Sequence, residues 1–117
     1  MISRNLLVGK CLAALLMFYP QNLYAEGFTS ADVLAWSEEG QNSYFNTSIS
    51  MIGILATRTG SHGEIATCLN TWYWNDEGSD PAKNALIRNV MKNLPDHHPQ
   101  AVILAVVEKY CGSFKSG

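Results

Sequence analysis

The residues best suited to bind a partner lie in one segment. In it, three large aromatic residues are followed closely by two carboxylates and a glycine. Successive helical positions turn by about 100°, so three adjacent rings cannot all face one core. Exposed Trp and Tyr beside carboxylates are common in protein-binding hot spots. The alternative is an aromatic plug over a disulfide with a solvated loop behind it, and the sequence does not decide between the two. The candidate partner-binding residues are Trp72, Tyr73, Trp74, Asn75, Asp76, Glu77, Gly78 and Ser79.

Two cysteines outside the N-terminal segment, Cys68 and Cys111, predict a structural disulfide. Only one intramolecular pairing exists between them. Closing a loop of about 44 residues stabilises a fold by roughly 4 kcal/mol on the chain-entropy model. The alternative is a nucleophilic thiol activated by His62, His97 or His98, although neither cysteine lies in a sequence typical of a catalytic thiol.

Motifs for catalysis or cofactor binding are missing from the sequence. It contains no Gly-rich phosphate loop, serine nucleophile elbow, paired-cysteine zinc spacing or H-E-x-x-H helix. Adjacent His97 and His98 point in different directions on a turn and cannot easily share a metal ion. The acidic pairs at 38–39 and 76–77 are sequence neighbours, which seldom converge on one cleft. We therefore expect a stoichiometric binding protein, not an enzyme, with no cofactor and no metal.

The first 25 residues have the layout of a secretory signal. Basic Arg4 and Lys10 come before or at the start of an apolar run over residues 11–19, and cleavage is expected after Ala25. That run is shorter than the roughly 20 residues of a membrane-spanning helix, although an uncleaved anchor is the alternative. We expect two parts, a signal peptide at 1–25 and one helical domain at 26–117, exported to a bacterial periplasm, where thiols are oxidised.

Composition limits the classes of partner. The chain has 117 residues, 15% of them charged, and a formal net charge of −2. The length excludes two packed domains. The charge balance gives no sign of the basic stripe that is typical of nucleic-acid binding. Removing residues 1–25 takes away two basic residues and no acidic one. The acidic remainder favours a basic partner or cleft over nucleic acid or a membrane.

Hydrophobic spacing predicts an all-α fold, a small single-domain bundle of four to five helices. The first helix is expected to begin at Thr29, with Asp32 completing a capping box and Phe28 packing on Val33, and to end at Gly40. Later helices are expected over 44–57, 64–74, 81–94 and 99–111.

Particular residues in the later helices support these boundaries. Met51, Ile54 and Leu55 recur at helical spacing with other apolar residues in the second helix. Residues 75–79 are expected to form a loop before Asp80 and Pro81 begin the next helix. The last helix is apolar on nearly every side over 101–107, so we expect it to be the most buried element.

Four short segments resemble one family, the Rap/Tai immunity proteins of type VI secretion systems. They are FTSADVL at 28–34, Cys-Leu at 68–69 before the aromatic stretch, LPDHHP at 94–99, and YCGSF at 110–114. The resemblance covers most of the chain after residue 25. It implies a small helical periplasmic protein, often a homodimer, that binds a peptidoglycan amidase delivered by a neighbouring cell and blocks its active-site groove.

The resemblance also implies roles for particular residues. Cys68 and Cys111 would form the structural disulfide, and a protruding loop, best matched by residues 74–79, would be the inhibitory element. Two other classes stay open. One is a small acid-stress chaperone, for which 15% charged residues is low; the other is a minor enzyme or metal carrier.

Overall fold

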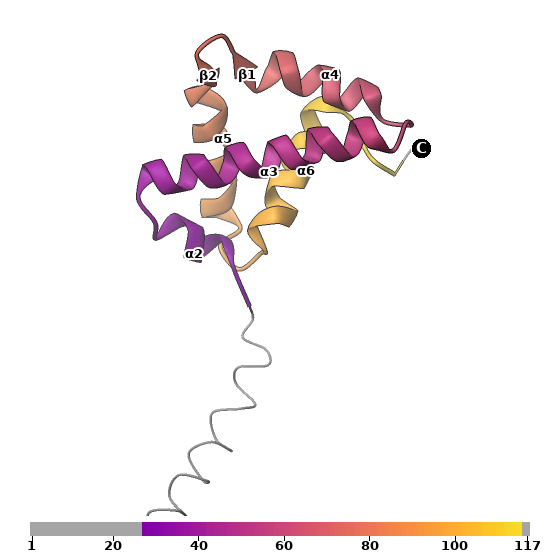
Figure 1. The fold of residues 1–117 in the computed structure, drawn as a ribbon. Helices are drawn as coiled ribbons and strands as arrows, with labels where there is room; N and C mark the ends of the chain where they lie inside the picture. Colours follow the sequence, from indigo (N-terminus) through magenta and orange to yellow (C-terminus); the bar gives the residue numbers. More distant parts are fainter. Residues whose placement is uncertain (1–26, 116–117) are drawn as a thin grey trace, which may run out of the picture.

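The computed structural model describes residues 27–115 as an all-α domain with one short β-hairpin (Figure 1). This confirms the predicted fold class. The predicted signal peptide at 1–25 lies outside the described residues, and no helix within residues 27–115 is long and apolar enough to cross a membrane. The elements in chain order are α2 (Ser30–Leu34), α3 (Glu38–Arg58), α4 (Gly63–Trp72), β1 (Trp74–Asn75), β2 (Gly78–Ser79), α5 (Pro81–Asn93) and α6 (Pro99–Cys111).

Helix α3 is the element against which most of the others pack. Its 21 residues extend for about 31 Å, and it contacts α4, α5 and α6. In Figure 1 it crosses the middle of the domain. Helices α5 and α6 pass behind it, and α4 runs above it. The buried apolar core consists of Val33, Phe45, Ile49, Ile52, Ala56, Ile65, Leu69, Tyr73, Ile87, Met91, Val102, Ile103, Val106 and Val107.

The predicted capping box at the start of α2 is confirmed. The Thr29 hydroxyl accepts from the backbone N–H of Asp32, and the Asp32 carboxylate accepts from the backbone N–H of Thr29 at 2.9 Å. Phe28 itself belongs to an aromatic cluster at this end of the domain. The Phe28 ring lies 5.7 Å from the ring of Trp36, and Tyr44 and His98 complete the cluster.

The predicted end of the first helix at Gly40 is wrong. Helix α2 ends at Leu34, and Ser37 caps a new helix by accepting from the backbone N–H of Gly40 at 3.1 Å. Two acidic residues, Glu38 and Glu39, then occupy the first turn, where the helix dipole favours negative charge. Gly40 therefore lies inside the first turn of α3 and terminates nothing.

Burial of the second predicted helix differs from its apolar pattern. Phe45, Ile49 and Ile52 are in the core, but Met51, Ile54 and Leu55 are each more than half exposed. The apolar residues of α3 are too many for one buried stripe, so part of the helix presents an apolar face to solvent.

The starts of the two C-terminal helices agree with the sequence analysis. Asp80 caps α5 by accepting from the backbone N–H of Ala82 at 2.9 Å, and Pro81 occupies the first turn. Pro99 does the same in α6, where His98 Nδ1 accepts from the backbone N–H of Gln100 at 3.1 Å. Helix α6 buries Val102, Ile103, Val106 and Val107 along one face, whereas Leu104 on another face is 37% exposed, so its apolar sequence is not matched by burial all round.

The predicted disulfide between Cys68 and Cys111 is present, and it joins the middle of α4 to the last residue of α6. The two Cα atoms are 5.5 Å apart. Next to it, the Trp72 ring stacks on the Tyr110 ring with centroids 5.1 Å apart. The bond and the stacked rings together hold α4 against the C-terminal end of α6.

We expect the Cys68→Ser/Cys111→Ser double variant to lose roughly 4 kcal/mol of unfolding free energy, because the disulfide restricts the unfolded chain through a long loop. Urea denaturation of the variant and of the oxidised protein measures the difference. An unchanged midpoint, or two free thiols in the folded protein by mass spectrometry, would contradict this expectation.

Candidate functional site

The segment expected to be a loop is a β-hairpin at the junction of α4 and α5 (Figure 1). Trp74 pairs with Ser79 and Asn75 with Gly78 in an antiparallel register, which leaves Asp76 and Glu77 at the tip. The Asn75 side-chain oxygen accepts from the backbone N–H of Glu77 at 2.8 Å. Gly78 has φ +122°, a conformation that favours glycine. The tip is therefore a defined turn and not a free loop.

The three aromatic residues before the hairpin face three different surroundings. Trp72 is half-buried and stacks on Tyr110, with the Lys83 ammonium 5.3 Å from its ring centroid. Trp74 is half-buried and sets the edge of its ring against Tyr73, with centroids 4.8 Å apart. The predicted divergence of the rings is confirmed, although helix α4 ends at Trp72 and not at Trp74.

Tyr73 is fully buried, so it cannot contact a partner from this surface as the sequence analysis expected. Its hydroxyl oxygen lies 2.6 Å from the side-chain oxygens of both Asn46, in α3, and Asn84, in α5. One hydroxyl has one proton and donates to one of them at a time. The Asn84 amide in turn donates to the Ser79 hydroxyl at 3.1 Å. This network fastens the hairpin to α3 and α5.

Burial also changes the acid–base chemistry of this phenol. Desolvation raises the pKa of Tyr73 to about 12, although its contact with Ser79 acts in the opposite direction. The phenol therefore stays protonated at any physiological pH. Its hydroxyl is therefore available as a hydrogen-bond donor to the two asparagines.

Two carboxylates occupy the tip of the hairpin without a cationic partner. Asp76 and Glu77 are exposed, and the one ion pair within residues 27–115 is a 4.0 Å contact between Lys83 and Asp80 at the start of α5. The tip thus presents negative charge that no neighbouring side chain neutralises. Such charge can steer and orient a basic partner.

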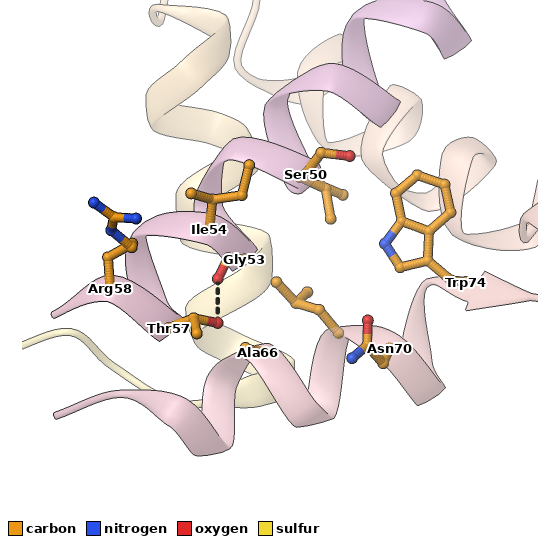
Figure 2. A pocket seen from close by; sticks show the side chains of 10 residues that line it. Ser50, Gly53, Ile54, Thr57, Arg58, Ala66, Asn70 and Trp74 are labelled. Carbon is orange, nitrogen blue, oxygen red and sulfur yellow. Dashed lines mark hydrogen bonds between the residues drawn. The ribbon is translucent and has the colours of Figure 1, made fainter. Parts of the chain in front are cut away.

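A groove begins at Trp74 and runs between α3 and α4, with a volume of about 400 Å³ (Figure 2). Figure 2 shows Trp74 at one end of the groove and Arg58 near the other, with the Arg58 side chain directed away from α4. The floor and walls between them are mainly apolar. The lining residues are Ile49, Ser50, Gly53, Ile54, Thr57, Arg58, Ala66, Leu69, Asn70 and Trp74.

The cysteines and two of the histidines considered for a reactive thiol or a metal site have structural contacts in the described part of the chain. Both sulfurs of Cys68 and Cys111 are in the disulfide and are not available as thiolates. His62 packs against the Phe114 ring at 4.8 Å, and His98 caps α6. Within residues 27–115, no three His, Cys, Asp or Glu side chains are grouped as a metal site requires.

The sequence analysis missed the two asparagines that hold the hairpin. Asn84 is buried and shares one face of α5 with Ile87 and Met91, at helical spacing. A polar residue in register with an apolar stripe is the signal that could have found it, because such a residue needs a buried partner. Asn46 and the groove residues carry no comparable signal, since their proximity depends on how α3 packs.

Comparison of the chain with known protein families, with curated proteins and with solved structures finds no match.

We expect Tyr73→Phe to lower the unfolding free energy by about 2 kcal/mol at neutral pH, because the variant leaves the buried Asn84 and the half-buried Asn46 without their hydroxyl partner. Chemical denaturation of both proteins measures this difference. A variant as stable as the wild type would show that the network does not anchor the hairpin.

We also expect this stability difference to depend on pH in one direction. The folded pKa of Tyr73 is about 12 and the ordinary value is 10.0. The extra stability is therefore fully present below about pH 10 and is lost as pH rises towards about 12. The pKa of Tyr44 is raised as well, so the test is the difference between the wild type and Tyr73→Phe. A constant difference from pH 8 to about 12 would contradict it.

Proposed function

We propose that this protein is a periplasmic immunity protein that binds and inhibits a peptidoglycan amidase effector of a type VI secretion system. The observation that carries the proposal is an acidic hairpin tip, formed by Asp76 and Glu77, which is exposed. The hairpin directly follows Tyr73, which is buried and holds its base in place. The family resemblance of the sequence supplies the class of partner. The disulfide agrees with an oxidising compartment.

The hairpin has the properties that inhibition of an enzyme cleft requires. Its two ends are fixed, because the backbone N–H of Asp80 donates to the carbonyl of Tyr73 at 2.8 Å and the strands pair between them. A pre-ordered element loses little conformational entropy on binding. Asp76 and Glu77 would engage the imidazolium and backbone donors of a cysteine–histidine amidase site, and Trp74 would cover adjoining apolar surface.

A second candidate function is a small acid-stress chaperone, and one observation favours it. Met51, Ile54 and Leu55 expose more than half of their surface on one side of α3, which is the kind of surface that holds unfolded chains. Suppression of aggregation of an acid-unfolded client at pH 2 to 3 tests this candidate. An immunity protein would inhibit its amidase stoichiometrically and leave client aggregation unchanged.

We expect Trp74→Ala to weaken binding of the cognate amidase by about 2 kcal/mol or more, because truncation of a central aromatic anchor removes buried contact area. Asp76→Ala and Glu77→Ala are expected to cost less and to act mainly on the association rate, with an effect that shrinks at high salt. Calorimetric titration and stopped-flow association against purified amidases measure both effects.

The matched control is Asp96→Ala, which removes one exposed carboxylate beyond the opposite end of α5 from the hairpin. It is expected to bind like the wild type. Thermal melts of every variant accompany the titrations. If Trp74→Ala binds normally but melts many degrees lower, the ring belongs to the core only and the hairpin is not the binding element.

A further inference from the structure

We infer that the groove between α3 and α4 is a binding site for an extended peptide segment that carries a carboxylate at one end and an apolar side chain about three residues away. The site adjoins the hairpin at Trp74 but does not depend on the proposed inhibition of an amidase. The inference rests on the shape of the groove, its two unlike ends and the unused polar groups along its walls.

The depth of the groove depends on a glycine in the middle of helix α3. Gly53 lies sixteen residues after the Ser37 cap of α3, where glycine is less favourable than alanine by about one kilocalorie per mole in an exposed helix. The fold does not require it, because a Cβ at this position would meet only the Leu69 side chain, at an ordinary contact distance of 4.0 Å. Its effect is to leave the floor of the groove open (Figure 2).

The two ends of the groove differ in chemistry. Arg58 is exposed and takes part in no ion pair with any of residues 27–115. Because its side chain is exposed, it has room to turn toward the groove, where its guanidinium would bind a carboxylate through two parallel hydrogen bonds. At the other end the Trp74 ring offers a flat apolar surface. A ligand that satisfies both ends has one acidic and one apolar group.

Polar side chains along the walls suit a peptide backbone. The Ser50 hydroxyl and the Asn70 amide are exposed and make no hydrogen bond with other described residues, so both are free to bond to main-chain groups. Ser50 and Arg58 are eight positions apart, or about 12 Å along α3. An extended peptide rises about 3.3 Å per residue, so this length corresponds to about four residues.

The test is a titration of the ¹⁵N-labelled, disulfide-bonded protein with blocked tetrapeptides, followed by two-dimensional NMR. The probes are acetylated and amidated Asp-Ala-Ala-Phe and its reverse, Phe-Ala-Ala-Asp, which cover both chain directions. The controls replace Asp by Asn. We expect millimolar binding that shifts the Gly53 amide and the Trp74 indole N–H, with the Asn peptides weaker by about fivefold because they lack the charge.

Four variants separate binding from folding. Gly53→Ala fits the floor and is expected to raise the melting temperature by roughly 4–8 °C. Gly53→Leu fills the groove and is expected to weaken the peptide at least tenfold while the protein stays folded. Arg58→Gln should remove the preference for Asp over Asn, whereas Lys92→Gln, an exposed cation on α5, should change nothing.

Three results would overturn the inference. They are no shift at the groove residues up to about 10 mM of either peptide, equal affinity for the Asp and Asn peptides, and undiminished binding to a folded Gly53→Leu variant. Asp76→Ala and Glu77→Ala should leave peptide binding unchanged. Failure of the groove and failure of the inhibitory hairpin are therefore distinguishable.

Discussion

The fold is organised by the need to satisfy one buried phenol. Tyr73 stands where α4 ends, and its ring has no exposed surface. Burying a hydroxyl without a partner costs one to a few kcal/mol, so the chain must bring polar groups to it. It does so with Asn46 from α3 and Asn84 from α5. The positions of three helices and of the hairpin between them are thereby linked at a single oxygen atom.

The same constraint explains the shape of the exposed segment that follows. The chain leaves the core at Tyr73 and returns at Asp80, where a backbone hydrogen bond of 2.8 Å joins the two residues. The intervening residues can only form a tight reversal, and Gly78 provides the positive φ that the reversal needs. A polar, acidic stretch that would be mobile on its own is consequently held at its base, and its two carboxylates project from a fixed position.

Much of the architecture could be predicted from local signals, because those signals act over a few residues. The capping box of Thr29 and Asp32, the Asp80–Pro81 start of α5 and the pairing of the two cysteines needed no knowledge of the fold. The prediction that a helix ends at Gly40 is wrong, because Ser37 and the acidic residues after it begin a helix there. A capping signal outweighs a glycine in such a position.

The candidate site was predictable in part only. The segment 72–79 was identified by its composition, but the separation of its three rings into a stacked, a buried and a groove-lining residue depends on packing between helices. The groove itself combines residues of α3 and α4 with Trp74 of the hairpin. No local pattern encodes such a surface, since periodicity shows which residues share a face and not what that face meets.

The attachment of α2 has a consequence for the order in which the domain assembles. The backbone N–H and the hydroxyl of Ser30 both donate to the carbonyl of His97, at 2.8 and 2.9 Å, across 67 positions of sequence. A helix of five residues is not stable in isolation. A chain that emerges N-terminus first therefore holds this segment unfolded until the connection between α5 and α6 has followed it. The first part of the described domain to leave the ribosome is thus among the last to fold.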